Sequence, residues 1–109
     1  MISTAPRVEK MSGFFKVLGD PTRLEMLRRM YTSEHCVCEF VEMFQISQPA
    51  ISRHLRVMKQ AGIILERKDR QWNYFRLNEQ DPFYPLLVQA IKELGELPVQ
   101  EHNLLKIKC

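Results

Sequence analysis

The stretch SQPAISRHLRVMKQAGIILERKDRQWNYFRL, residues 47–77, changes from helical to strand-like hydrophobic spacing about halfway along. Ser47 is a good helix N-cap, Pro49 is tolerated in a first turn, and Gly62 favours the left-handed conformation that ends helices. The two runs that follow, IILERK and WNYFRL, are β-branched or aromatic, and the residues between them include no glycine. The stretch therefore predicts a helix followed by a β-hairpin whose turn type stays open.

The predicted helix has two chemically different sides. At 100° per residue, Ile51, Leu55 and Met58 fall on one side, which we expect to pack, with Ala61 at its edge. The other side offers hydrogen-bonding and positively charged groups, which read base edges or hold phosphates in a major groove. His54 lies near the packed edge and is interpreted as a core-edge or phosphate contact. The DNA contacts predicted on this helix are Ser47, Gln48, Pro49, Ser52, Arg53, His54, Arg56 and Lys59.

Positive charge is concentrated in one part of the chain. The net charge is +3, yet residues 53–76 hold seven basic residues against Glu66 and Asp69, a local +5. Such local basicity indicates a polyanion partner, and the alternative is an ordinary amphipathic helix with a solvated charged face. The basic hairpin that follows this helix favours DNA. Within the hairpin, we expect the aromatic residues to be mostly core and only the tip to touch phosphate or the minor groove. The DNA contacts predicted in the hairpin are Arg67, Lys68 and Arg70.

Helical spacing also predicts elements on both sides of this stretch. Further helices are expected over residues 8–18, 22–31 and 36–44, the second of them after the start signal Asp20-Pro21, with a polar break at residues 32–35. A last helix opens at Asp81-Pro82 and is ended by Gly95 and Pro98. About five helices and a two-stranded wing describe a mainly α, winged helix-turn-helix fold.

Length and composition exclude several classes of protein. A chain of 109 residues is one domain, expected to span residues 1–97 with a tail at 98–109, and a chain this small gains from dimerisation. An odd count of three cysteines argues against a secreted disulfide scaffold. The chain shows no apolar signal region and no run of roughly 18 apolar residues, so a cytoplasmic protein without a membrane partner is expected. Catalytic residue sets at suitable spacing are absent, so an enzyme is not expected.

The runs LGDPTRLEML, CVCEF and QISQPAISRHLRVMKQAGIILERKDRQWNYFRL, within about residues 14–78, resemble the ArsR/SmtB family of metal-sensing repressors. The resemblance implies a homodimer that releases double-stranded operator DNA when it binds an inducer. In that family the first and last helices form the dimer interface. The alternative is that the apolar surplus of these helices only completes a monomer core; the residues concerned are Phe14, Phe15, Phe83, Leu87 and Ile91.

A Cys-Val-Cys-acid run at the start of the third helix resembles the arsenic- and antimony-responsive members of this family. The resemblance implies that thiolates of Cys36 and Cys38 bind As(III) or Sb(III) as the inducer. Soft trivalent ions favour sulfur, and a helix N-terminus favours the thiolate, whereas neighbouring glutamates oppose it. Alternative roles for the pair are apolar packing, another soft metal, or thiol oxidation; a winged-helix protein-interaction module is the rival function.

The spacing of the pair suggests a mechanism. In an ideal helix, residues 36 and 38 point about 200° apart, too far for both sulfurs to hold one small ion. We therefore hypothesise that chelation distorts the first turn and shifts the recognition helix. Val41 occupies the position of a third cysteine in the arsenic-type pattern, so Cys109 or a solvent thiol is a candidate third ligand, with an uninvolved terminal thiol as the alternative. His35 and His102 are interpreted as lone histidines and not as metal ligands; a surface role is favoured for His35, and modulation of the neighbouring thiols is the alternative.

Overall fold

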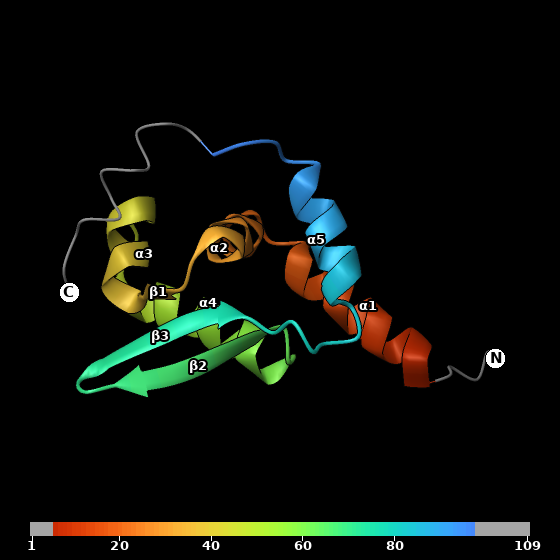
Figure 1. Ribbon diagram of the computed structural model, residues 1–109, viewed down its shortest axis with the longest axis horizontal. Helices are drawn as coiled ribbons and strands as arrows, with labels where there is room; N and C mark the ends of the chain where they lie inside the picture. Colours follow the sequence, from red (N-terminus) through yellow and green to blue (C-terminus); the bar gives the residue numbers. More distant parts are fainter. Residues whose placement is uncertain (1–5, 98–109) are drawn as a thin grey trace.

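The computed structural model describes residues 6–97, and Figure 1 shows them as helices arranged around a small sheet. The sheet is antiparallel and three-stranded, and the helices of the described part number five. The winged helix-turn-helix prediction is confirmed, whereas the predicted tail at 98–109 lies outside the described residues. The elements are α1 (Pro6–Leu18), α2 (Pro21–Thr32), β1 (His35–Cys36), α3 (Val37–Phe44), α4 (Gln48–Gln60), β2 (Ile64–Asp69), β3 (Trp72–Leu77) and α5 (Tyr84–Lys92).

The helix ends follow the chemistry of their capping residues. Asp20 accepts a hydrogen bond from the Arg23 N–H at 3.0 Å, and Ser47 accepts one from the Ala50 N–H at 3.3 Å, as predicted for N-caps. Gln45 ends α3 in the left-handed conformation, with φ 56° and ψ 39°, which makes the tight turn into α4. Gly62 follows α4 at φ 78°, where an L side chain would be strained.

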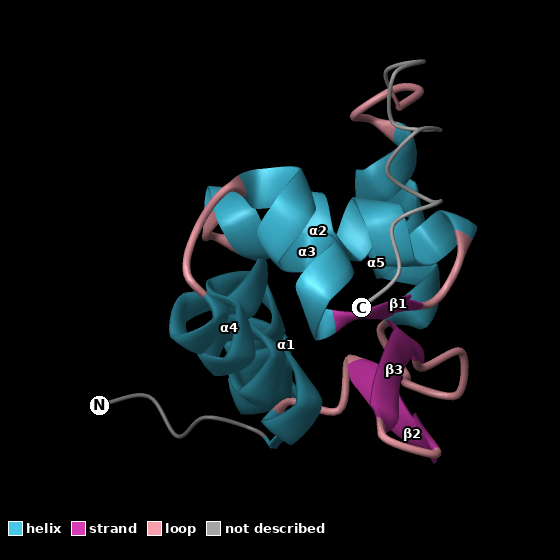
Figure 2. Cartoon of the chain, turned by 90° about the vertical axis from the view of Figure 1, so that its left-hand side faces the viewer, coloured by secondary structure: helices cyan, strands magenta, loops and turns pink. Residues whose placement is uncertain are grey.

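The sheet runs in the order β1–β3–β2, so the short first strand extends the hairpin (Figure 2). Asp69 pairs with Trp72, which leaves a two-residue turn in which Arg70 has φ 61°. The predicted hairpin is therefore confirmed, while β1 was not predicted. A strand of two residues has no periodicity to detect, and it forms because His35 and Cys36 pair with Phe75 and Tyr74 on β3.

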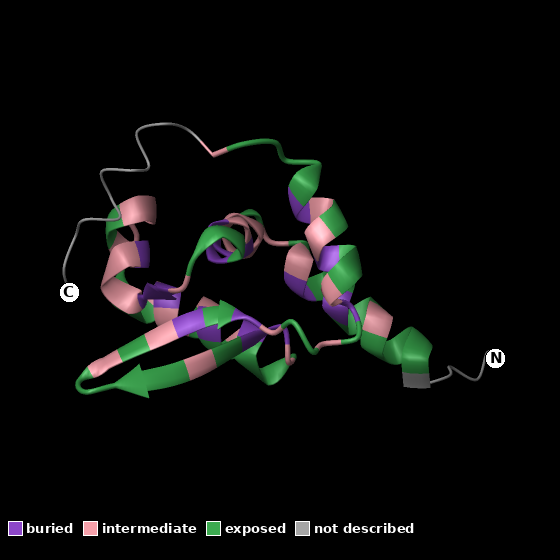
Figure 3. Ribbon diagram, in the orientation of Figure 1, coloured by how far each residue is buried: buried purple, intermediate pink, exposed green. Residues whose placement is uncertain are grey.

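The core lies between the helices and the inner face of the hairpin, and each helix carries both buried and exposed residues (Figure 3). The predicted packing side of α4 is confirmed, because Ile51 and Met58 are fully buried and Leu55 nearly so, although Ala61 is exposed. On β3 only the inner face is buried, at Phe75 and Leu77, and the other two aromatic residues are half-buried.

The helix α5 begins later than predicted. Asp81 accepts the N–H of Phe83 on its carboxylate at 3.1 Å and the N–H of Tyr84 on its carbonyl at 2.9 Å, so residues 81–84 form a turn before the helix starts. The helix ends at Lys92, which leaves Leu94 beyond it. In the part of the chain that the structure describes, no helix is long and apolar enough to cross a bilayer.

The apolar surplus of the first and last helices mostly completes the monomer core. Phe14 and Phe83 are buried against each other with ring centroids 5.2 Å apart, and both Leu87 and Ile91 are buried. The core alternative therefore holds for these four residues. Phe15 is the exception, because it is 52% exposed on α1.

Candidate DNA interface and cysteine pair

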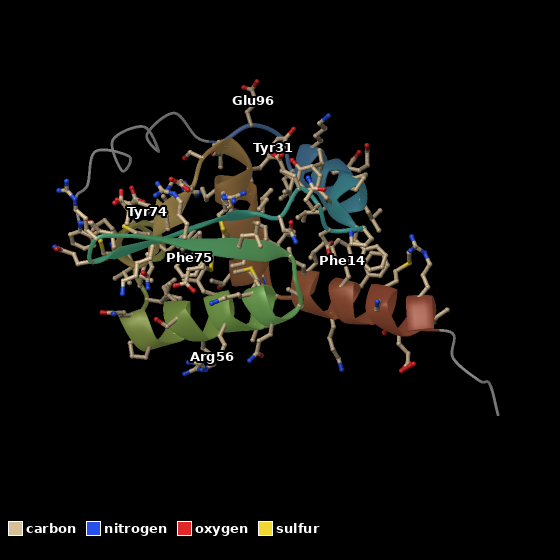
Figure 4. All side chains as sticks on the ribbon, turned by 60° about the horizontal axis from the view of Figure 1, so that its bottom comes forward. Phe14, Tyr31, Arg56, Tyr74, Phe75 and Glu96 are labelled. Atoms are coloured by element: carbon tan, nitrogen blue, oxygen red, sulfur yellow. The ribbon has the colours of Figure 1, made fainter. Side chains whose placement is uncertain are left out.

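The outward side of α4 presents most of the residues predicted to contact DNA. Arg53 and Arg56 are exposed in the middle of the helix, and Figure 4 shows Arg56 pointing away from the sheet. Ser47, Gln48 and Pro49 are exposed at its N-terminal end. Because α4 packs on α3 and β2 through its other side, this face is left for a ligand.

The remaining predicted residues of α4 are tied to neighbouring elements. Lys59 donates a hydrogen bond to Glu66 of β2 at 2.5 Å, and Ser52 is half-buried. His54 is also half-buried, with its Nδ1 3.4 Å from Arg23 Nη1. Arg23 in turn donates to the Val17 carbonyl at 2.8 Å, so His54 lies at the junction of α4 with α2 and the end of α1.

In the wing, one of the three predicted basic residues is paired with a carboxylate. Lys68 and Arg70 are exposed, whereas Arg67 donates from Nε to both carboxylate oxygens of Glu34 at 3.1 Å and from Nη2 to one of them. The same guanidinium lies over the Tyr74 ring, 4.8 Å from its centroid. Hydrogen bonding from Arg67 lowers the pKa of the Glu34 carboxyl below its ordinary value, which favours the charged carboxylate.

The cysteine pair lies where β1 meets α3. Cys36 has extended backbone, with φ −99° and ψ 170°, and is the N-cap of α3, so the predicted start of this helix was wrong by one residue. The Sγ atoms of Cys36 and Cys38 lie 3.6 Å apart, so the two sulfurs are neighbours at the start of the helix. The expected divergence of 200° is also wrong, because Cys36 is not helical. The hypothesis that chelation must unwind the first turn therefore loses its basis.

His35 is buried, contrary to the surface position that the sequence suggested. It is 1% exposed, and its ring packs edge-on against Phe40 at a centroid distance of 5.4 Å. Its Nε2 lies 3.3 Å from the Ser33 hydroxyl and its Nδ1 3.4 Å from Oε1 of Glu39. The polar residues 32–35 do not predict this burial, because it depends on strand pairing with β3.

The cysteine pair adjoins the wing directly and α4 only through α3. Cys36 is in register with Tyr74 of the wing, and Cys38 belongs to α3, which packs on α4. Within residues 6–97 no group of three His, Cys, Asp or Glu side chains is placed to hold a metal ion. The candidate third ligand Cys109, like His102, lies outside the described residues.

A helix pair joined by a tight turn, followed by a basic hairpin, defines a winged helix-turn-helix DNA-binding protein. Residues 20–65 match the family described as bacterial regulatory protein, arsR family. The chain is also 40% identical over 92 residues to an uncharacterized HTH-type transcriptional regulator of Methanocaldococcus jannaschii, a match covering 84% of this chain and 93% of that protein. The chain belongs to the arsR family of transcriptional repressors, which are DNA-binding proteins and not enzymes, so the interaction-module interpretation is not supported.

Two further comparisons are informative. The chain is 45% identical over 69 residues to arsenic resistance transcriptional regulator ArsR1 of Pseudomonas putida, covering 62% of this chain and 54% of that protein. Among solved structures, the transcriptional repressor BigR of Xylella fastidiosa superimposes with a TM-score of 0.68 at 26% identity, covering 81% of this chain and 85% of that one.

Proposed function

We propose that the protein is a homodimeric repressor that leaves its operator when As(III) or Sb(III) binds the thiolates of Cys36 and Cys38. The observation that carries this proposal is the contact of the two sulfurs at 3.6 Å, at a point that adjoins both the wing and the helix before α4. Several relatives are arsenical resistance operon repressors, which supports the same inducer. Because its proposed partner is operator DNA, we expect the protein to act in the cytoplasm.

The sulfur spacing fits a single soft ion. Two thiolate bonds of about 2.3 Å, the length found at zinc, meeting at about 100° span about 3.5 Å between sulfurs. When arsenous acid binds, each thiol replaces one hydroxyl group and one water molecule leaves for each bond formed. A third thiol replaces the remaining hydroxyl, and Cys109 or a small solvent thiol is the proposed source.

Release is proposed to pass through strand β1 as well as through α3. Any change at Cys36 reaches the wing through its pairing with Tyr74, and any change at Cys38 reaches α4 through the packing of α3. Coupling between inducer and DNA sites is typically about 1–3 kcal/mol, or roughly 5- to 150-fold in affinity. A loss of affinity in that range is enough to release the repressor from an operator that is only moderately occupied.

The proposed DNA contacts are those that the fold leaves accessible. Arg53 and Arg56 are assigned to base edges or phosphates. We assign to the DNA backbone Ser47, Gln48, Pro49 and Ser52. His54 is half-buried, so we assign it to a phosphate contact only. Lys68 and Arg70 are assigned to the wing contact. Lys59 and Arg67 already have carboxylate partners, so we place them at the margin of the interface.

Dimerisation is proposed to cover the exposed apolar residues of α1 and α5. Val8 and Phe15 are 57% and 52% exposed on α1, and Leu86 on α5 is 38% exposed, as is Leu94 just beyond it. Apart from Leu94, these side chains belong to the first and last helices of the described chain. A two-fold axis between them would set half-sites about 34–36 Å apart.

The test is binding of a labelled operator fragment, titrated in parallel with arsenite, cadmium, zinc and peroxide. The wild-type protein should be released by arsenite, while Cys36→Ser with Cys38→Ser should bind DNA normally and ignore it. Release of the double variant by arsenite would show that the sensor lies elsewhere. Thiol oxidation is the second candidate trigger, favoured by the same sulfur contact; release by peroxide but not arsenite would select it.

A further inference from the structure

Glu39 forms a capping box with the first cysteine of the pair. Its Oε1 accepts the backbone N–H of Cys36 at 2.9 Å, while the Cys36 side chain faces the backbone N–H of Glu39. Such boxes ordinarily combine serine or threonine at the N-cap with glutamate or glutamine three residues later. Here cysteine takes the serine position, and because sulfur is a weak acceptor, the carboxylate makes the stronger half of the box.

The box decides where the first sulfur points. Holding the Cys36 N–H keeps this residue extended at ψ 170° and turns its side chain over the first turn of α3. Cys38 is the second residue of that helix, and its Sγ lies 3.6 Å from the Sγ of Cys36. If residue 36 instead joined the helix, the two side chains would diverge by about 200° and the contact would be lost.

The carboxylate that makes this bond is itself held in place. The Glu39 side chain is only 14% exposed, and the buried His35 ring lies 3.4 Å from the same Oε1. His35 is fixed in turn by its edge-on contact with Phe40, which is fully buried. The position of Cys36 is therefore determined from the core, through Glu39.

From this arrangement we propose that Glu39 is a positioning residue for soft-ion binding: it preorganises the two sulfurs through its hydrogen bond and is not itself a ligand. This inference rests on the proposed function for the identity of the ion, but the sulfur placement is independent of it. Loss of a group that orients metal ligands typically weakens binding about 10- to 100-fold. The acceptor atom, and not the negative charge, is what the placement requires.

The experiment compares Glu39→Gln, which keeps an oxygen acceptor, with Glu39→Met, which has a similar length and only a weak thioether acceptor. Both are made in the full chain with Cys109→Ser, after reduction, and far-UV circular dichroism confirms that each is folded. Glu42→Met is the matched control, because Glu42 is exposed on the same helix. Arsenite affinity is read from the sulfur-to-arsenic absorption band. Dibromomaleimide, which bridges adjacent thiols, reports sulfur placement without arsenic.

We expect Glu39→Met to lose affinity about 10- to 100-fold and Glu39→Gln to stay within about threefold of the parent chain. Bridging yield should follow the same order, with Glu42→Met unchanged. Equal losses in both Glu39 variants would identify the carboxylate as a ligand, and no loss in either would remove its role; both results overturn the proposal. If the parent does not bind arsenite but the bridging order holds, the proposed inducer fails while the positioning role stands.

Discussion

Replacing Glu34 with glutamine should make operator binding more sensitive to salt. In the folded chain Glu34 holds the Arg67 guanidinium through hydrogen bonds to both carboxylate oxygens. Glutamine removes the negative charge, so Arg67 becomes available to a phosphate. Each newly neutralised phosphate steepens the slope of log affinity against log salt by about 0.9, or about 1.8 for two wings of a dimer.

The size of the effect is measurable. Between 50 and 200 mM salt, a fourfold change, an added slope of about 1.8 corresponds to roughly 12-fold more loss of affinity than the parent shows. Fluorescence anisotropy of a labelled operator at four or five salt concentrations gives the slope directly. At low salt the Glu34→Gln variant should bind more tightly than the parent.

A double-mutant cycle identifies the residue responsible. Arg67→Ala alone should leave the slope nearly unchanged, because Arg67 is already paired with Glu34, and Glu34→Gln with Arg67→Ala should return the slope to the parent value. If Arg67→Ala alone flattened the slope by about 0.9 per wing, Arg67 would contact phosphate in the parent and the reasoning would be refuted.

Four other changes have definite expected outcomes. Arg53→Ala should weaken operator binding by about 1–3 kcal/mol in anisotropy titrations while size-exclusion chromatography shows an unchanged oligomer. Cys109→Ser should weaken arsenite-driven release if this thiol is the third ligand; unchanged release assigns it no role. Phe40→Ala removes a fully buried ring and should cost about 3–5 kcal/mol in denaturant unfolding. The pKa of Asp20 is lowered chiefly by the hydrogen bond from the Arg23 N–H. The charged carboxylate therefore stabilises the fold above its ordinary pKa, and this stability is lost as pH falls through the pKa of the folded state. Asp20→Asn should flatten the acid side of a plot of unfolding free energy against pH.

The parts of the fold that were predictable are those specified by local sequence. The packed side of α4 follows from 100° periodicity, and its start follows from Ser47 as an N-cap. The hairpin likewise follows from the change to strand-like residues after Gly62. Each of these signals is contained within about a dozen residues of chain.

What could not be predicted depends on contacts between distant residues. The pair between Glu34 and Arg67 spans 33 positions, and neither residue has a local signature for it. Burial of His35 depends on pairing with β3, which is about 40 residues later, and the extended backbone of Cys36 depends on that pairing together with the hydrogen bond from its N–H to Glu39. The sulfur geometry was therefore predicted wrongly, and the role of the two cysteines in binding an inducer stays a prediction.

The wing turn has a consequence for how the chain could be adapted. Arg70 holds a positive φ of 61°, a conformation that costs an L-residue about 1–2 kcal/mol and that glycine adopts freely. The tip is thus a place where a more relaxed backbone and a cationic side chain exclude each other. Glycine at position 70 would relax the backbone of the turn but would remove one exposed positive charge from the wing, so at this position backbone stability is gained only by losing charge.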